Sequence, residues 1–171
     1  MNTANKIMIV LGDRQWTLNA LHLACAMVRN NNGEVILVKM VPVQHPIMLG
    51  TDAGYRDFTV QDEESTCFFA ATAEDYGVPS SVFVCQYASY VSGIADVAEQ
   101  IEVTAVFCQS PRSHVPFWAK AQKWLLEQAL ARRHIALYTL EETDGTLEWT
   151  PSVTISAEKQ APAGREQPRF P

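Results

Sequence analysis

The stretch KIMIVLGDRQWTLNALHLACAMVRNNNGEVILVKMVPV, residues 6–43, carries the pattern that decides the fold. Its first apolar run, residues 7–11, is continuous and rich in β-branched side chains, which is typical of a strand buried on both faces, as in a parallel sheet. Residues 16–30 have apolar side chains at helical spacing, and residues 35–41 form a second apolar run that ends at Pro42. The stretch therefore predicts a strand, a helix and a parallel second strand, joined by a right-handed crossover.

The alternation of helix and strand patterns continues to residue 141. We expect three more helices and three more strands, in the order helix 59–76, strand 81–86, a short helix that Ser89 caps, strand 104–108, helix 117–133 and strand 135–140. The inward residues that we expect on the last two helices are Ile94, Val97, Ala98 and Ile101, and then Trp118, Ala121, Leu125 and Ala129. The prediction is an α/β fold with an open, doubly wound, five-stranded parallel sheet flanked by four helices.

The composition changes near residue 141. We expect residues 1–141 to form one α/β domain and residues 142–171 to form a C-terminal extension. Within the extension, residues 147–155 are predicted to add a short edge strand, although Pro151 argues against a long one. Residues 156–171 are rich in proline and poor in apolar side chains, which is typical of a disordered tail.

Composition and charge exclude several classes of protein. The formal net charge of −6 disfavours nucleic-acid partners, because an acidic surface repels phosphate backbones. The four cysteines lie in apolar stretches without a CxxC spacing, which indicates a reducing compartment and no metal site. No apolar run approaches the length of a membrane span, and the N-terminus lacks a signal peptide, so we expect a cytoplasmic protein.

Two loops follow the carboxyl ends of predicted strands, where ligands bind in folds of this class. The residues expected in this candidate crevice are Gly12, Asp13, Val41, Gln109, Ser110, Arg112 and His114. Arg112 could hold a phosphate or another anion beside Ser113 and His114, or belong to a solvated loop. Asp13 could contact a ligand, or cap the first helix. No histidine stands at catalytic motif spacing, so we expect no enzyme activity.

Three stretches resemble the universal stress protein family. They are residues 6–43, with Ala20-Leu21 and Val41-Pro42 at matching places, VSGIADVAEQIEVTAVFC at residues 91–108, and ARRHIALYTLE at residues 131–141. The resemblance is one of element pattern over residues 6–141. It implies the adenine nucleotide alpha hydrolase-like fold of that family.

ATP-binding members of that family carry a Gly-x2-Gly-x9-Gly-Ser/Thr motif after the fourth strand. In this chain the three glycine positions hold Gln109, Arg112 and Gln122, and the Ser/Thr position holds Lys123. The family's aspartate at the end of the first strand falls on Gly12, with Asp13 one residue later. The resemblance therefore implies the non-ATP-binding, UspA-like branch, with no cofactor expected, although AMP or another anion is an open alternative.

The resemblance also implies a function and an assembly. It implies a regulatory stress-response module that acts through protein contacts, including a regulatory protein partner, as a homodimer. Because family members pair through the last strand, the expected dimer interface is Ile135, Leu137, Tyr138 and Leu140. The alternative is a small-molecule binder that uses a degenerate nucleotide pocket. An enzyme on the same fold would need an SGGxDS-type or HIGH-type motif, which the first loop lacks.

Overall fold

The computed structural model describes residues 5–43, 47, 49–50, 60–109, 116–143 and 146–152. Its helices and strands follow one another in the predicted alternation. In chain order they are β1 (Lys6–Val10), α1 (Arg14–Val28), β2 (Glu34–Pro42), α2 (Val60–Asp75), β3 (Ser80–Tyr87), α3 (Tyr90–Gln100), β4 (Ala105–Phe107), α4 (Pro116–Ala131), β5 (Ala136–Thr143) and β6 (Thr146–Ser152).

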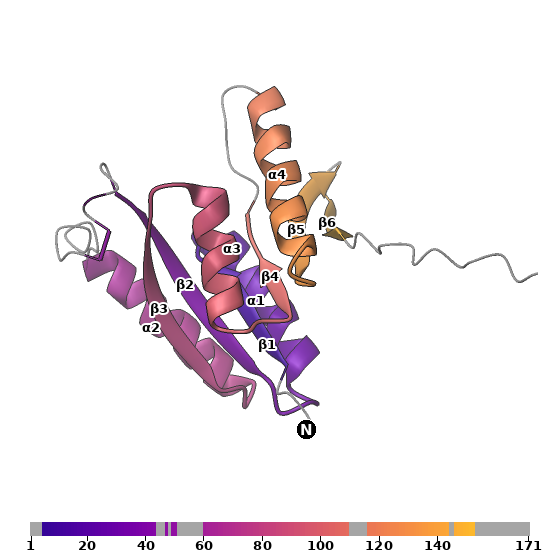
Figure 1. Cartoon of the computed structure of the whole chain (residues 1–171). Helices are drawn as coiled ribbons and strands as arrows, with labels where there is room; N and C mark the ends of the chain where they lie inside the picture. Colours follow the sequence, from indigo (N-terminus) through magenta and orange to yellow (C-terminus); the bar gives the residue numbers. More distant parts are fainter. Residues whose placement is uncertain are drawn as a thin grey trace, which may run out of the picture.

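The strands form one sheet in the order β3-β2-β1-β4-β5-β6 (Figure 1). Strands β1 to β5 are parallel, and β6 turns back to pair antiparallel with β5. The chain builds outward from β1 to β3, and then crosses to the other side of β1 to form β4 and β5. The point at which strand order reverses therefore lies between β1 and β4, where folds of this class bind ligands.

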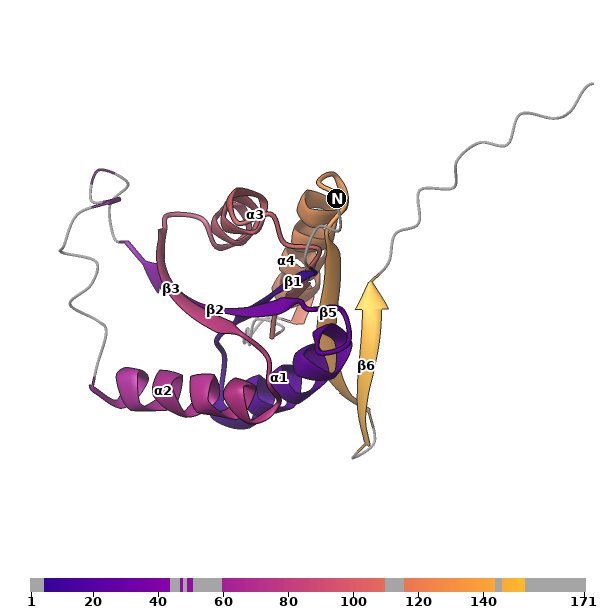
Figure 2. The same cartoon turned by 90° about the horizontal axis from the view of Figure 1, so that it is seen from below.

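Helices cover both faces of the sheet (Figure 2). Helices α1 and α2 lie on one face, and α3 and α4 lie on the other. Successive side chains of β1 alternate between these faces. Ile7 and Ile9 pack on the side of α1 and α2, while Met8 and Val10 pack on the side of α3 and α4. All four are buried, which explains the unbroken apolar run in the sequence. The prediction of a five-stranded parallel sheet between four helices is confirmed.

Helix α4 presents a different face to the core from the one predicted. Leu126 and Leu130 are its buried residues, whereas Trp118 is 59% exposed and Leu125 is 48% exposed. The predictions of an inward Trp118 and an inward Leu125 are therefore wrong. The helix sequence carries large apolar side chains around its whole circumference, so periodicity alone allowed more than one inward face.

Helix α3 agrees with its predicted face only in part. Ile94 and Ala98 are buried as expected, while Val97 and Ile101 are partly buried at its margin. Ser89 occupies the N-cap position, but its side chain makes no capping hydrogen bond. The predicted N-cap position is therefore confirmed, whereas the capping hydrogen bond expected from Ser89 is not formed.

Strand β6 changes the expected interface at β5. Leu137 of β5 lies opposite Ser152, and Leu140 lies opposite Trp149, so β5 has β4 on one side and β6 on the other. Ile135, which precedes β5, and Leu137 are buried, and Tyr138 stacks on Phe107 with ring centroids 4.8 Å apart. The premise that β5 is an open edge is therefore wrong, because the hairpin with β6 occupies that edge. The division at residue 141 stays a prediction, and the expected tail at 156–171 lies outside the described residues.

The described helices include none with the length and apolar character that a membrane crossing requires.

Candidate functional site

The candidate crevice lies where β1 and β4 end, at the reversal of strand order. Gly12 and Asp13 follow β1, and Gln109 follows β4 two residues beyond its end. Because parallel strands end at the same edge of the sheet, these two short segments meet although they are far apart in the sequence. The structure thus brings together three of the predicted site residues.

Asp13 caps helix α1. Its Oδ1 atom accepts a hydrogen bond from the backbone N–H of Trp16 at 2.9 Å, and its backbone is extended, as N-cap geometry requires. One residue earlier, the N–H of Gly12 donates to Oγ1 of Thr17 at 3.0 Å, and Thr17 is completely buried. Hydrogen bonds to Trp16 and Thr17, in the first turn of α1, therefore hold the turn that follows β1.

Gln109 closes the crevice against this turn. Its Oε1 atom accepts a hydrogen bond from the backbone N–H of Asp13 at 3.1 Å, and its Nε2 atom donates to Oδ2 of Asp13. A Cβ atom added to Gly12 would overlap Gln109 Oε1 and lie 3.3 Å from Gln109 Cβ. The Gln109 side chain therefore lies directly over Gly12, in space that a ligand at this turn would need.

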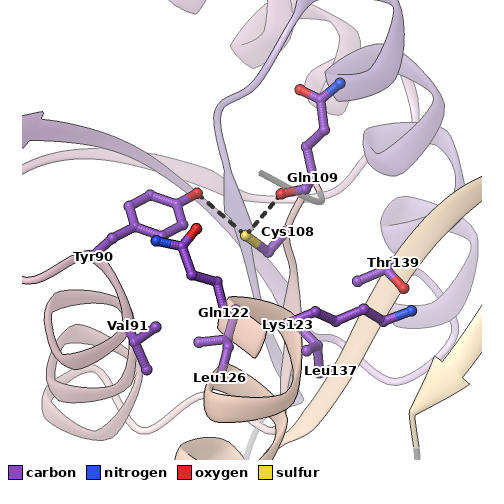
Figure 3. A pocket seen from close by; sticks show the side chains of 9 residues that line it. All are labelled: Tyr90, Val91, Cys108, Gln109, Gln122, Lys123, Leu126, Leu137 and Thr139. Atoms are coloured by element: carbon purple, nitrogen blue, oxygen red, sulfur yellow. Dashed lines mark hydrogen bonds between the residues drawn. The ribbon is translucent and has the colours of Figure 1, made fainter. Parts of the chain in front are cut away.

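A small cavity lies on the other side of β4, between α3, α4 and β5 (Figure 3). Its volume is about 10 Å³, which is room for one water molecule. Gln122 and Lys123 of α4 line it, and in Figure 3 Lys123 extends toward Thr139 of β5. Thr139 is 2% exposed, and its Oγ1 atom has no hydrogen-bond partner among the described residues. Two positions of the family's glycine motif thus hold long side chains around a space of one water molecule.

The same cavity contains a buried thiol. The Tyr90 hydroxyl lies 3.4 Å from Sγ of Cys108, a hydrogen-bond distance for sulfur. Burial raises the pKa of Cys108 to about 11, although the hydrogen bond with Tyr90 opposes this shift. Burial, followed by the neighbouring Cys108, also raises the pKa of Tyr90. Both groups therefore stay protonated near neutral pH, which is the opposite of an activated nucleophile.

The remaining predicted site residues do not join this cluster. Val41 is buried in β2, opposite Gln86 of β3, and takes no part in the Gly12–Asp13–Gln109 contacts. Ser110, Arg112 and His114 lie outside the described residues. Sequence reasoning missed Thr17, Tyr90 and Cys108 as parts of the site. The position of Cys108 at the end of the fourth strand was a usable signal, whereas Tyr90 approaches it only through the packing of α3.

A wide groove runs between α3 and α4. Its volume is about 600 Å³. The residues that line it are Ser89, Tyr90, Val91, Ser92, Trp118, Gln122, Trp124, Leu125, Gln128, Ala129 and Arg132. Arg133, two residues after α4, forms ion pairs with α3, with its Nη2 atom 3.0 Å from Oδ1 of Asp96 and its Nε atom 2.7 Å from Oε2 of Glu99.

The groove is apolar for an exposed surface. Trp118 and Trp124, which line it, are 59% and 58% exposed. Arg132 is the one charged side chain among the described residues that line the groove. In a chain of net charge −6, this surface is therefore aromatic and locally basic.

Nothing in the described part of the chain forms a metal site. No three histidine, cysteine or acidic side chains there are grouped so that they could hold an ion.

Comparison by sequence assigns no family, since no family model matches and no curated protein matches. Comparison by structure is informative. A protein of the universal stress protein family from Burkholderia pseudomallei superposes with a TM-score of 0.55 and 14% identity, covering 79% of this chain and 94% of that chain. A universal stress protein from Archaeoglobus fulgidus gives a TM-score of 0.54, 12% identity and coverage of 80% and 93%. A universal stress protein in complex with cAMP gives a TM-score of 0.56, 12% identity and coverage of 81% and 98%. The chain therefore has the fold of the universal stress proteins.

Proposed function

We propose that this chain is a non-catalytic, cytoplasmic regulatory module of the universal stress protein type, which acts through protein contacts as a homodimer and does not bind ATP in the manner of that family. The observation that carries the proposal is the Gln109 side chain, which fills the space over Gly12 and is hydrogen-bonded to Asp13 in two places.

A triphosphate needs backbone N–H groups that it can approach closely, and glycine permits that approach. Here the corresponding region holds Gln109, Gln122 and Lys123, and the cavity that all three line has room for about one water molecule. A nucleotide would have to displace these side chains and break the hydrogen bonds of Gln109. The free energy needed to displace these side chains would weaken the affinity for a nucleotide.

The groove between α3 and α4 supports the proposal that the chain acts through protein contacts. Tryptophan and arginine dominate the binding energy of protein interfaces, and both line this groove. Its aromatic side chains fit an apolar anchor, and Arg132 fits a carboxylate. We therefore assign the groove to an amphipathic, acidic segment of a regulatory protein.

The nucleotide part is tested by calorimetry and thermal unfolding with Mg²⁺–ATP. We expect neither heat of binding nor stabilisation for the unmodified chain. Saturable stabilisation by ATP would overturn the proposal.

The protein part is tested by selecting a displayed peptide library on the chain. We expect enriched peptides to combine apolar anchors with Asp or Glu, and to lose affinity for Trp118→Ser and Arg132→Ala. Phe68→Ser is the matched control, because Phe68 is a similarly exposed aromatic residue, on α2. Peptides that bind all variants equally would show that the groove is not their site.

The alternative function is binding of AMP or another small anion in the altered crevice. It is favoured by the likeness in fold to a universal stress protein that was solved in complex with cAMP. Under this alternative, a panel of nucleotides should include one that stabilises the chain, and Arg112→Ala should remove the effect. If the full panel gives no stabilisation, this alternative is excluded.

A further inference from the structure

Strand β3 forms one edge of the sheet. In the described part of the chain it pairs with β2 on one side, and no strand pairs with its other side (Figure 2). An open edge presents unpaired backbone donors and acceptors, which another strand can use.

The backbone direction shows which residues face outward. The N–H of Val35 donates to the carbonyl of Pro79, and the N–H of Val43 donates to the carbonyl of Tyr87. Odd-numbered residues of β3 therefore direct their backbone groups toward β2. Because these groups alternate along a strand, those of Ser80, Val82 and Val84 point to the outer edge.

The side chains of β3 do not protect this edge. Natural edges are blunted by charged residues or proline, but Ser80–Tyr87 (SSVFVCQY) contains neither. Val82 is 40% exposed and Phe83 is 46% exposed. The opposite edge strand, β6, carries Glu148 and Pro151. The two edges thus differ in the residues that decide whether a strand can pair.

We propose that a second copy of this chain pairs with β3 through its own β3, antiparallel and across a two-fold axis. This inference rests on the proposed homodimer and names its interface. An antiparallel pair of identical strands satisfies two-fold symmetry, and the uncharged strand places no like charges opposite each other.

A two-fold axis at Phe83 uses the open edge well. Phe83 of each copy then lies in the closer, non-hydrogen-bonded pair, while Val82 of each copy exchanges backbone hydrogen bonds with Val84 of the other. The exposed phenyl rings and valines become cross-strand neighbours.

Sedimentation of the full chain across the micromolar range tests the proposal. We expect a dimer whose dissociation constant rises at least about tenfold in Val82→Pro and in Phe83→Lys. Proline at residue 82 removes an outward N–H and leaves the bonds to β2 intact. Circular dichroism checks that each variant is folded. If Val82→Pro does not fold, Phe83→Lys provides the test.

Phe117→Lys is the matched control, because it removes an exposed phenyl group from α4 and leaves β3 unchanged. It should dimerise normally. A dimer that survives both β3 substitutions would overturn the β3 interface but leave the proposed homodimer intact. A monomer at every concentration would overturn both.

Discussion

Replacing Gly12 with alanine tests whether Gln109 closes the crevice. The added Cβ would overlap Gln109 Oε1, and only movement of that side chain relieves the overlap. The movement breaks the bond from the Asp13 N–H at 3.1 Å and the bond from Gln109 Nε2 to the Asp13 carboxylate. Gly12 itself lies outside the positive-φ region, so alanine adds no backbone strain.

The cost follows from these two hydrogen bonds. A neutral bond contributes about 0.5–1.5 kcal/mol and a bond to a charged group about 1.5–3 kcal/mol. Asp13 and Gln109 are both partly exposed, so water can replace part of the lost hydrogen bonding. We therefore expect Gly12→Ala to lower the free energy of unfolding by about 2 kcal/mol. For a chain of this size, that change lowers Tm by about 4–8 °C.

The decisive measurement is a double-mutant cycle with Gln109→Ala. In that background the two hydrogen bonds and the overlap with Oε1 are already absent, and the nearest remaining contact of the added Cβ is the Cβ atom of residue 109 at 3.3 Å. Gly12→Ala should then destabilise the chain far less than in the unmodified background, because alanine reduces the entropy of the unfolded state and only the contact with that Cβ atom opposes the gain. Urea unfolding of the four proteins gives the coupling energy. An equal effect of Gly12→Ala in both backgrounds would refute the contact.

Three further predictions concern the second layer of helices and its thiol. Leu130→Ala should reduce the free energy of unfolding by about 2–5 kcal/mol, because Leu130 is fully buried, whereas Leu125→Ala should cost far less in the same urea titration. Burial raises the Cys108 pKa from 9.0 to about 11. The protonated thiol therefore makes its full contribution to the free energy of unfolding below pH 9, and this contribution, about 3 kcal/mol, is lost as the pH rises through 11. Cys108→Ala should remove this part of the pH dependence of the free energy of unfolding, measured by urea titration at alkaline pH. Arg133→Ala should cost at most about 1 kcal/mol, with the loss disappearing at high salt, because its partners on α3 are exposed.

The sheet was predictable because its central strands are continuous apolar runs in the sequence. Strands β1 and β2 are buried on both faces, which requires an apolar residue at nearly every position. The helices between them have apolar side chains at a different period, so the boundary between the two patterns is visible in the sequence. The candidate crevice followed from this order, since Gly12 and Gln109 each come directly after a strand.

The inward face of α4 was not predictable in the same way. Both Trp118 and Leu130 are large and apolar, but only Leu130 packs on the sheet. Which of the two is buried depends on the rotation of α4 against β5 and α3, which is set by tertiary packing. The clamp between Gln109 and Asp13 joins residues that are 96 positions apart and depends on one side-chain conformation, so no local pattern encodes it.

The place of Asp13 bears on how nucleotide binding is recognised in this fold. An aspartate near the end of the first strand suggests a nucleotide contact, but here one carboxylate oxygen caps α1 and the other accepts from Gln109. Loss of an N-cap aspartate costs about 1 kcal/mol, so stability alone is reason enough for this residue. The presence of Asp13 is therefore no evidence for a nucleotide contact in this chain. On the proposed function, we expect the discriminating positions to be 109, 112, 122 and 123, because side chains there would obstruct the approach of phosphates to the backbone.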